Sequence, residues 1–245
     1  MQNIPTIIRT HIKNHKRLEL LERTIVSWHD KQLYDLGELY IIDDTSPLQD
    51  ELLDLLRNFQ IKYKRSNNTP DTKNGLYESL KIDDGWNEIR KDSSVLCTVD
   101  DIVFGNGFKE RIIKFLEEEE SQLENFGMMG LFACYGPEFR INNRYKDLHL
   151  FNFPLDKFYG ANCHIYSKQL SKLLLENWEG VLNKTEPYPF CCDDLWVRDI
   201  CKKEGLNIYN SIVDYAQHTG MNVRSFGDKE IDEGSEYQSS CFIGE

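Results

Sequence analysis

The stretch that decides the fold is SVLCTVDDIV, residues 94–103, an almost continuous apolar run interrupted only by two aspartates near its end. Half of its residues are β-branched, and polar segments flank it on both sides. Runs of this kind are typical of a central parallel strand that is covered on both faces. We therefore expect one strand over Ser94–Val103, with Asp100 and Asp101 at its acidic end.

Strand and helix signals alternate in the residues before this stretch. Short apolar runs predict strands over Ile4–Thr10, Glu38–Asp44 and Ile61–Lys64. Apolar residues recur at helical spacing over 18–28, and again after Ser46, which with Gln49 forms the pattern of a helix-capping box. This alternation predicts a doubly wound α/β layer, in which ligands bind at the carboxyl ends of the strands.

The residues after this stretch show a less regular pattern. Four successive glutamates at 117–120 are interpreted as the solvated face of a helix. The expected elements are a helix over Phe108–Glu124, a strand over Gly127–Cys134, a loop over Pro137–Pro154, a strand over Phe158–Tyr166 and a helix over 195–205 that Gly205 closes. The tail after Gly227 is rich in Glu, Ser and Gly, and we expect it to be flexible.

Length and charge exclude several classes of protein. A chain of 245 residues buries about three quarters of its unfolded surface, so it folds alone. The formal net charge of −12 (29 Lys and Arg against 41 Asp and Glu) repels phosphate backbones and anionic membranes. Seven cysteines without a C-x-x-C pair argue against a disulfide framework and a zinc ribbon. With no secretory signal and no apolar run long enough to span a bilayer, we expect a cytoplasmic protein.

Three pairs of adjacent aspartates are the candidate functional residues. Asp100–Asp101 ends the most hydrophobic strand, where unpaired carboxylates are unfavourable, so a hard divalent cation such as Mg²⁺ or Mn²⁺ is an expected partner. Asp43–Asp44 ends another expected strand, and Asp193–Asp194 stands at an expected helix start. Capping of a turn or a helix is the alternative interpretation for each pair. His218 is a lone histidine, for which a structural role is the alternative to metal binding.

Six segments of the chain resemble, in order, the GT-A fold glycosyltransferases of the large family-2-like group. They are IIRTHIKNHKRLELLERTIVSW (7–28), ELYIIDDTSP (38–47), VLCTVDDIVF (95–104), FYGANCHIYSKQL (158–170), CCDDLWVRDICKKEGL (191–206) and AQHTGMNVRSFG (216–227). The sequence departs from the family pattern at Arg9, where proline is usual, at Thr45, where glycine is usual, and at Thr98, which takes the first acidic position of a strict D-x-D motif. Family members with an adjacent acidic pair match Asp100–Asp101 instead.

The resemblance implies a role for each candidate residue. Thr10, Asp43 and Asp44 would face the nucleotide, Asp100 would hold its ribose, and Asp101 would bind the metal. His218 would add a metal ligand, and Asp193 or Asp194 would serve as the catalytic base. Among the basic residues that would neutralise the diphosphate, Lys13, Lys16, Arg17, Arg65 and Lys73, the sequence leaves the choice open, and Lys73 is included in the expected nucleotide-sugar site.

The implied fold is a single α/β GT-A domain over 1–245, with a mostly parallel sheet flanked by helices. A nucleotide-sugar-binding half covers about 1–105, an acceptor-binding half about 106–227, and 228–245 is the flexible tail. The implied activity is the metal-dependent transfer of a sugar from a nucleotide-diphosphate sugar to a hydroxyl of a glycan or similar acceptor, with inversion at the anomeric carbon. A UDP-sugar is the donor that we expect first. Mn²⁺ or Mg²⁺ is the implied cofactor.

Three alternatives remain open at this point. A viral or phage enzyme, acting in the host cytoplasm, would glycosylate hydroxymethylated DNA bases. Net charge disfavours this alternative, while the basic run His11–Arg17 and the loop with Arg140, Arg144 and Lys146 keep it open. A sugar-phosphate nucleotidyltransferase would need a glycine-rich loop after the first strand, and none is present. A non-catalytic nucleotide-sugar-binding protein would bind donor without turnover.

Overall fold

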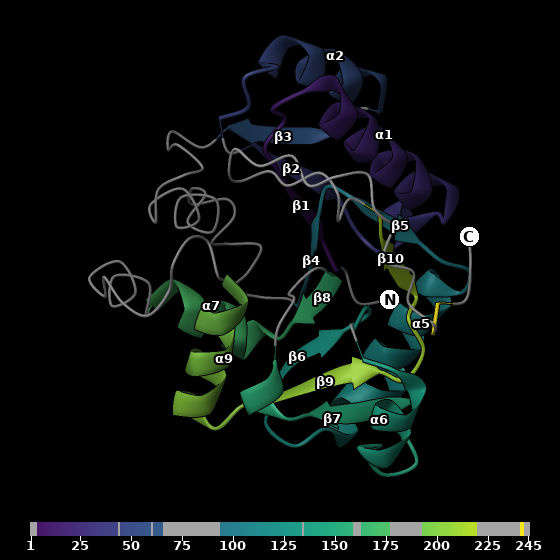
Figure 1. Cartoon of the computed structure of the whole chain (residues 1–245), viewed down its shortest axis with the longest axis vertical. Coiled ribbons are helices and arrows are strands. Elements are labelled where there is room, and N and C mark those ends of the chain that lie inside the picture. Colours follow the sequence, from purple (N-terminus) through teal and green to yellow (C-terminus); the bar gives the residue numbers. More distant parts are fainter. Residues whose placement is uncertain are drawn as a thin grey trace.

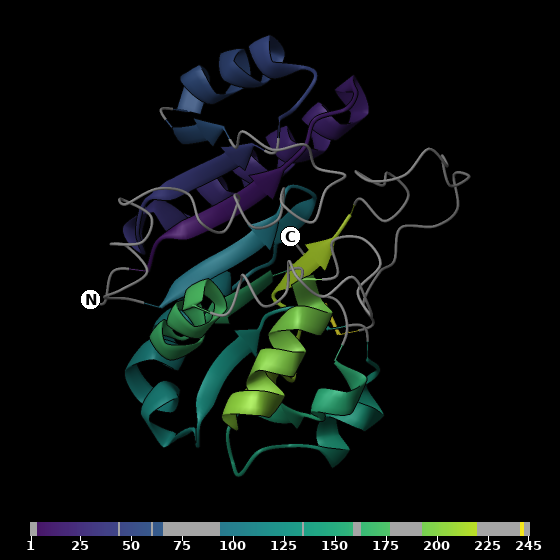
Figure 2. The ribbon, with the colours of Figure 1, turned by 90° about the vertical axis from the view of Figure 1, so that its left-hand side faces the viewer.

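A mixed eight-stranded sheet forms the centre of the fold (Figures 1 and 2). The computed structural model describes residues 4–43, 45–59, 61–65, 94–133, 135–158, 163–176, 193–219 and 241–242. The strand order is β3-β2-β1-β4-β8-β6-β9-β7. The strands are β1 (Thr6–Thr10), β2 (Leu39–Asp43), β3 (Lys62–Arg65), β4 (Val95–Val99), β6 (Phe126–Gly130), β7 (Leu150–Phe153), β8 (Cys163–Tyr166) and β9 (Asn207–Ser211). The first four strands in this order run parallel, as does the β6–β9 pair, so the expected α/β class with a mostly parallel sheet is confirmed.

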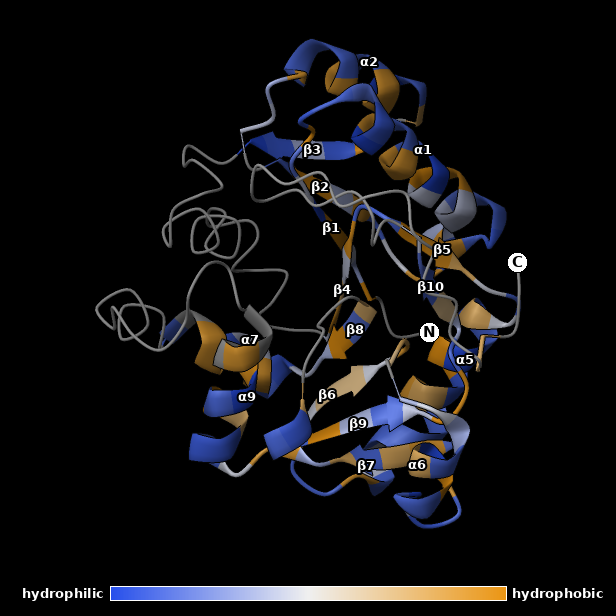
Figure 3. Cartoon of the chain, in the orientation of Figure 1, coloured by the Kyte–Doolittle hydropathy of each residue, from blue (hydrophilic) through white to orange (hydrophobic). Residues whose placement is uncertain are grey.

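Helices cover both faces of the sheet, and Figure 3 shows that they carry both apolar and polar residues. The buried apolar side chains of helices and sheet form two clusters. Helices α1 (His15–Asp30), α2 (Gln49–Phe59) and α5 (Phe108–Lys114) contribute to the larger cluster, and α7 (Lys168–Glu176) and α9 (Asp193–Glu204) contribute to the second. Neighbouring residues of a strand point to opposite faces. Accordingly, Ile165 belongs to the larger cluster and Tyr166 to the second. The core is therefore layered as helix, sheet and helix.

The expected single strand over Ser94–Val103 is wrong. β4 ends at Val99, a turn follows at Asp100–Asp101, and β5 (Ile102–Phe104) belongs to a separate two-stranded sheet with β10 (Ala216–His218). Helix α1 supplies the hydrogen bonds that hold the chain after the turn, because the Thr24 hydroxyl accepts from the Ile102 N–H at 3.1 Å. An apolar run alone does not reveal this turn, since residues on both sides of it are buried.

Three other expectations need correction. The expected loop over 137–154 contains the helix α6 (Pro137–Asn142) and the strand β7, and the proline at the first turn of α6 is a helix-start signal. The helix expected over 108–124 consists of α5, one π-helical turn η2 (Phe115–Glu119) and a 3₁₀ turn η3 (Glu120–Gln122). Within η2, Glu119 is buried and pairs with Arg111 at 2.7 Å, so the glutamate run is not entirely solvated.

Two smaller features also differ from expectation. The Ser46 hydroxyl accepts the N–H of Ile12 at 2.7 Å, so it ties the loop before α2 to the end of β1, and α2 begins only at Gln49. Part of the expected flexible tail is held in place, because the Asp214 N–H donates to the carbonyl of Cys241 at 3.0 Å. Cys241 and Phe242 therefore belong to the folded part of the chain, and the other residues of 228–245 lie outside the described residues.

Gly130 lies where two strands leave no space for a side chain. A Cβ atom built on Gly130 would lie 1.4 Å from Oδ1 of Asn210 on the neighbouring strand β9. Gly130→Ala is therefore expected to lower the free energy of unfolding by about 1–3 kcal/mol, because Asn210 must move within a packed core. Urea unfolding measures this change. Gly136→Ser is the matched control, since nothing lies within 4 Å of a Cβ there; equal stability of both variants would contradict the prediction.

His164 is a buried histidine in the middle of the sheet. Its exposed fraction is 1%, and neither ring nitrogen has a hydrogen-bond partner among the described residues. Burial lowers the pKa of His164 to about 3. Between that value and the ordinary pKa of about 6.5, the unfolded chain binds a proton that the folded chain does not, so stability falls as the pH falls.

This difference in pKa predicts a loss of about 2 kcal/mol in the free energy of unfolding from His164 alone, between pH 7 and pH 5. Urea unfolding of the wild type and of His164→Phe at both pH values checks it. The variant should lose about 2 kcal/mol less than the wild type over this interval. His29→Gln, at an exposed position, is the control and should keep the wild-type dependence. An unchanged dependence in His164→Phe would refute the assignment.

Candidate functional site

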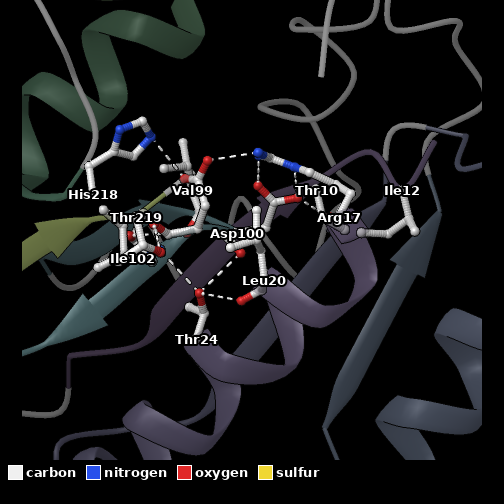
Figure 4. Close-up of polar contacts among 12 residues, drawn as sticks. Thr10, Ile12, Arg17, Leu20, Thr24, Val99, Asp100, Ile102, His218 and Thr219 are labelled. Atoms are coloured by element: carbon white, nitrogen blue, oxygen red, sulfur yellow. Dashed lines mark hydrogen bonds and ion pairs between the residues drawn. The ribbon is translucent and has the colours of Figure 1, made fainter. Parts of the chain in front are cut away.

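Four segments meet at the carboxyl end of β4 and form the candidate site (Figure 4). They are the end of β1, the first turns of α1, the turn Asp100–Asp101 and the end of β10. Because β1 and β4 are parallel neighbours, Thr10 and Asp100 come to the same edge of the sheet. Of the sequence-predicted site residues, Thr10, Asp100, Asp101 and His218 are thereby brought together.

Helix α1 places Arg17 among these residues. Asn14 caps the helix, and its side-chain oxygen accepts the N–H of Arg17 at 2.9 Å. Arg17 shares the buried side of α1 with Leu21, Ile25 and Trp28, which follow it at helical spacing. Arg17 is one of five basic residues that the sequence offers for the site. It differs from the others because it recurs at helical spacing with apolar residues, which predicts that it lies on the buried side of the helix.

The guanidinium of Arg17 contacts both aspartates of the pair (Figure 4). It donates from Nη2 to Asp100 Oδ1 and from Nε to Asp100 Oδ2 at 3.1 Å, a two-pronged contact of the strong charge-assisted kind. Nη1 donates to Asp101 Oδ2 at 2.7 Å. The Thr10 hydroxyl also donates to Asp100 Oδ2. Arg17 is therefore the positively charged partner that two buried, adjacent carboxylates require.

The backbone of the acidic turn is fixed from two sides (Figure 4). On one side, the Thr24 hydroxyl of α1 donates to the carbonyl of Asp100 at 3.0 Å. On the other side, Thr219 donates to the carbonyl of Asp101 from its N–H at 2.8 Å and from its hydroxyl at 3.0 Å. Since Thr219 follows directly after β10, these bonds also hold His218 next to Asp101. Neither threonine was identified from the sequence as part of the site.

His218 lies against the oxygen of Asp101 that faces away from Arg17. Nε2 of His218 is 3.0 Å from Asp101 Oδ1, and the histidine side chain is 16% exposed. Within the described part of the chain, His218 Nδ1 is a buried atom without a hydrogen bond, and Asp101 Oδ1 has no polar neighbour beyond the imidazole of His218. Buried polar atoms in this state are unfavourable unless a ligand completes them. This oxygen and Nε2 beside it are therefore the candidate binding atoms.

Burial and charge oppose each other in this cluster. Burial raises the pKa of Asp101, but the charge of Arg17 and the contact with His218 outweigh burial and bring that pKa to about 2. Burial dominates for Asp100 and raises its pKa despite the contacts with Arg17 and Thr10. For Arg17, burial lowers the pKa, but the two carboxylates prevail and raise it. With both aspartates ionised, one guanidinium leaves one negative charge of the pair uncompensated.

These atoms suit a hard divalent cation. Two neighbouring ligands of an octahedral ion at about 2.1 Å lie about 3.0 Å apart, which is the separation of Asp101 Oδ1 and His218 Nε2. The described residues contain no group of three or more His, Cys, Asp or Glu side chains that could hold a metal ion. A cation at this position would therefore take one carboxylate oxygen and one imidazole nitrogen from the described residues and its other ligands from phosphate oxygens and water.

Asp43 lies beside Thr10 in the sheet, at the end of β2. Its carboxylate is fully buried and accepts hydrogen bonds from the Ser46 N–H at 2.8 Å, from the Ser46 hydroxyl and from the Tyr63 hydroxyl at 2.8 Å. Burial and the contact with Asp43 raise the pKa of Tyr63 to about 12. Asp43 thus organises the loop at this edge of the site.

The other predicted residues are placed in part or not at all. Asp44 and Lys73 lie outside the described residues. Asp193 and Asp194 are the first two residues of α9, as the resemblance implies, but their side chains lie outside the described ones.

The proposed DNA-contacting loop loses one of its basic residues. Arg140 is fully buried and pairs with Asp214 through two contacts of 2.7 Å. Arg144 and Lys146 are exposed, but Arg144 donates to the carbonyls of Asp147 and Leu148, and Lys146 pairs with Glu124. Arg140 therefore cannot contact a nucleic acid, which weakens the alternative of an enzyme that acts on DNA.

Comparison with known proteins supports the fold. No family model matches the chain, and no curated protein matches it. Among solved structures, residues 1–349 of S. aureus TarS in complex with UDP-GlcNAc are similar over 88% of this chain and 58% of that chain, with 14% identity and a TM-score of 0.51. A second crystal structure of S. aureus TarS 1–349 is similar over 86% of this chain and 60% of that chain, with 13% identity and a TM-score of 0.49.

The chain spans less than two thirds of the length of these TarS structures. At this level of identity, the likeness concerns the fold alone. None of the helices in the described part of the chain combines the length and the apolar character that crossing a membrane requires.

Proposed function

We propose that this protein is a glycosyltransferase that moves a sugar from a nucleoside-diphosphate sugar to an acceptor hydroxyl. The observation that carries the proposal is the buried turn Asp100–Asp101 at the carboxyl end of β4, with Thr10 on one side and His218 on the other. The fold is shared with a protein whose structure contains UDP-GlcNAc, which supports a UDP-sugar as the first donor to test.

The residues of the site divide the work of such a reaction. Thr10 and Asp100 would line the nucleoside side of the site, where Asp100 has one acceptor position left for a ribose hydroxyl, and Asp43 would hold the loop beside the base. Asp101 Oδ1 and His218 Nε2 would hold a divalent cation. A Mg²⁺ or Mn²⁺ ion bound there would stabilise the negative charge that develops on the leaving diphosphate.

The acceptor hydroxyl must lose its proton as it attacks the anomeric carbon. A carboxylate at the start of α9, Asp193 or Asp194, would accept this proton as general base. Attack from the face opposite the diphosphate would invert the anomeric centre. Lys73 would contribute positive charge toward the diphosphate. The acceptor is proposed only by class, as a glycan or a similar compound with a free hydroxyl.

Thermal unfolding with a panel of donors tests the proposal. The panel contains UDP, GDP, CDP and dTDP and their common sugars, each with and without Mn²⁺. A ligand at 100 times its dissociation constant adds about 2.7 kcal/mol to the free energy of unfolding, which raises the Tm by a few degrees in a chain of this size. We expect one nucleotide to raise the Tm in the presence of Mn²⁺.

The matched variants are Asp101→Asn, in the site, and Asp54→Asn, on the surface, where Asp54 is 72% exposed. The shift should disappear in the first variant and persist in the second. Release of nucleoside diphosphate from the donor then distinguishes an enzyme from a protein that only binds. No shift with any nucleotide would refute the proposed donor site.

A further inference from the structure

We propose that Arg17 is a built-in counter-ion that keeps Asp100 out of cation binding and leaves Asp101 as the single carboxylate ligand. The inference about the cation rests on the proposed function, while the inference about the counter-ion rests on the contacts alone. Arg17 would then act as a positioning residue, since it acts through the two aspartates rather than on a substrate.

The hydrogen bonds of Asp100 carry the first step. A carboxylate has about four lone-pair positions for donors or metals. Asp100 Oδ2 accepts from Thr10 and from Nε of Arg17, and Oδ1 accepts from Nη2 of Arg17. Three of these positions are therefore occupied by groups of the chain, and the residue is 1% exposed. Asp100 is poorly placed to add a cation to its partners.

Asp101 differs from Asp100 in one respect. Its Oδ2 accepts from Nη1 of Arg17, whereas the described residues place only the imidazole of His218 next to its Oδ1, with Nε2 at 3.0 Å. The single guanidinium thus separates two adjacent aspartates into one that it contacts through both oxygens and one that it contacts through Oδ2 alone, which leaves Oδ1 to His218. This division selects the pair Asp101 Oδ1 and His218 Nε2 for a cation.

The direction of the Arg17 side chain excludes a simpler role. A residue that neutralises a diphosphate must present its N–H groups to the ligand. Arg17 is 6% exposed and directs Nε, Nη1 and Nη2 at the two carboxylates (Figure 4). Its charge compensates one of two adjacent buried carboxylates. Without this positive charge, the two buried carboxylates would destabilise the fold strongly. The protein is therefore expected to be folded without any cation.

Titration with Mn²⁺ alone, followed by the EPR signal of the free ion, tests this division. Asp101→Asn is expected to weaken Mn²⁺ binding at least about tenfold, whereas Asp100→Asn should change it by less than about threefold. Arg17→Gln should strengthen Mn²⁺ binding about tenfold, because it removes a competing positive charge and releases Asp100 as a second carboxylate ligand. A purely structural role for Arg17 would not produce tighter binding. Equal losses in Asp100→Asn and Asp101→Asn would overturn the proposal.

Stability in the presence of EDTA tests the counter-ion separately from the cation. The wild type should keep its Tm, and Arg17→Gln should lower it by several degrees because two carboxylates then face each other. The double variant Arg17→Gln with Asp100→Asn should recover most of that loss. If no protein binds Mn²⁺ but the double variant recovers, the proposed function fails and the counter-ion stands. If the double variant is as unstable as Arg17→Gln, the counter-ion role of Arg17 is refuted.

The test also covers the case in which Arg17→Gln does not fold. Folding of the double variant then supports the counter-ion role, and failure of the double variant to fold refutes it. Mn²⁺ binding by Asp100→Asn and Asp101→Asn still decides which aspartate is the ligand.

Discussion

Asp101→Asn is expected to lower the rate of nucleotide-sugar cleavage by about 100- to 1,000-fold, the loss typical of removing one group that stabilises charge in a transition state. The change keeps the shape of the side chain and an oxygen that can accept from Nη1 of Arg17. It removes the charge on Oδ1, which lies 3.0 Å from His218. Release of UDP from a UDP-sugar measures the rate without a known acceptor, because water can replace the acceptor hydroxyl.

Asp54→Asn is the control for this measurement. Asp54 pairs with Arg57 on the surface of α2, and both side chains are more than two thirds exposed. This variant should retain the wild-type rate. The Tm of both variants shows whether the fold is intact. A folded Asp101→Asn protein with the wild-type rate would show that Asp101 does not take part in the reaction.

Arg140→Leu is expected to have the largest effect on stability, a loss of about 3–5 kcal/mol in the free energy of unfolding. Arg140 is fully buried and contacts both carboxylate oxygens of Asp214 at 2.7 Å. It also donates to the carbonyls of Ala133 and Tyr135, both at 2.6 Å. The variant leaves a buried charge and these carbonyls without their donor. Urea unfolding measures the loss.

Two further variants show whether this loss comes from the buried ion pair. Arg144→Leu replaces an exposed arginine of the same segment and should change stability by less than about 0.5 kcal/mol. The double variant Arg140→Leu with Asp214→Leu removes both charges, so it should be more stable than Arg140→Leu alone. If Arg140→Leu loses no more than Arg144→Leu, the pair contributes nothing to folding, contrary to its complete burial.

The sequence predicted the parallel part of the sheet well. The expected strands Ile4–Thr10 and Glu38–Asp44 correspond to β1 and β2 with shifts of one or two residues. Apolar runs separated by amphipathic helices have few other folded arrangements. In the remainder of the sheet, β8 forms the last four residues of the strand expected over Phe158–Tyr166, whereas β7, also four residues long, lies where a loop was expected. Short strands of this kind carry little periodicity of their own.

The candidate site was predictable in its parts but not in its contacts. The acidic pair and His218 are visible in the sequence because carboxylates after an apolar run demand a partner. The partner itself, Arg17, belongs to a helix, and nothing in the local sequence connects it with Asp100. The same is true of Thr24 and Thr219, whose hydroxyls fix the backbone of the turn. Charged and polar partners of a site are determined by packing, which single-sequence patterns do not contain.

The contacts of the candidate site also set an order in which it can form during synthesis. Thr10 and Asp100 are 90 positions apart, and Asp101 and Thr219 are 118 positions apart. A ribosome releases the chain from the N-terminus, so β10 emerges after the other strands of the described chain. The ribosome-bound chain holds Arg17 and both aspartates long before His218 exists. A nascent chain interrupted before residue 216 would therefore lack the imidazole at Asp101, and the two candidate cation ligands exist together only after synthesis has passed residue 218.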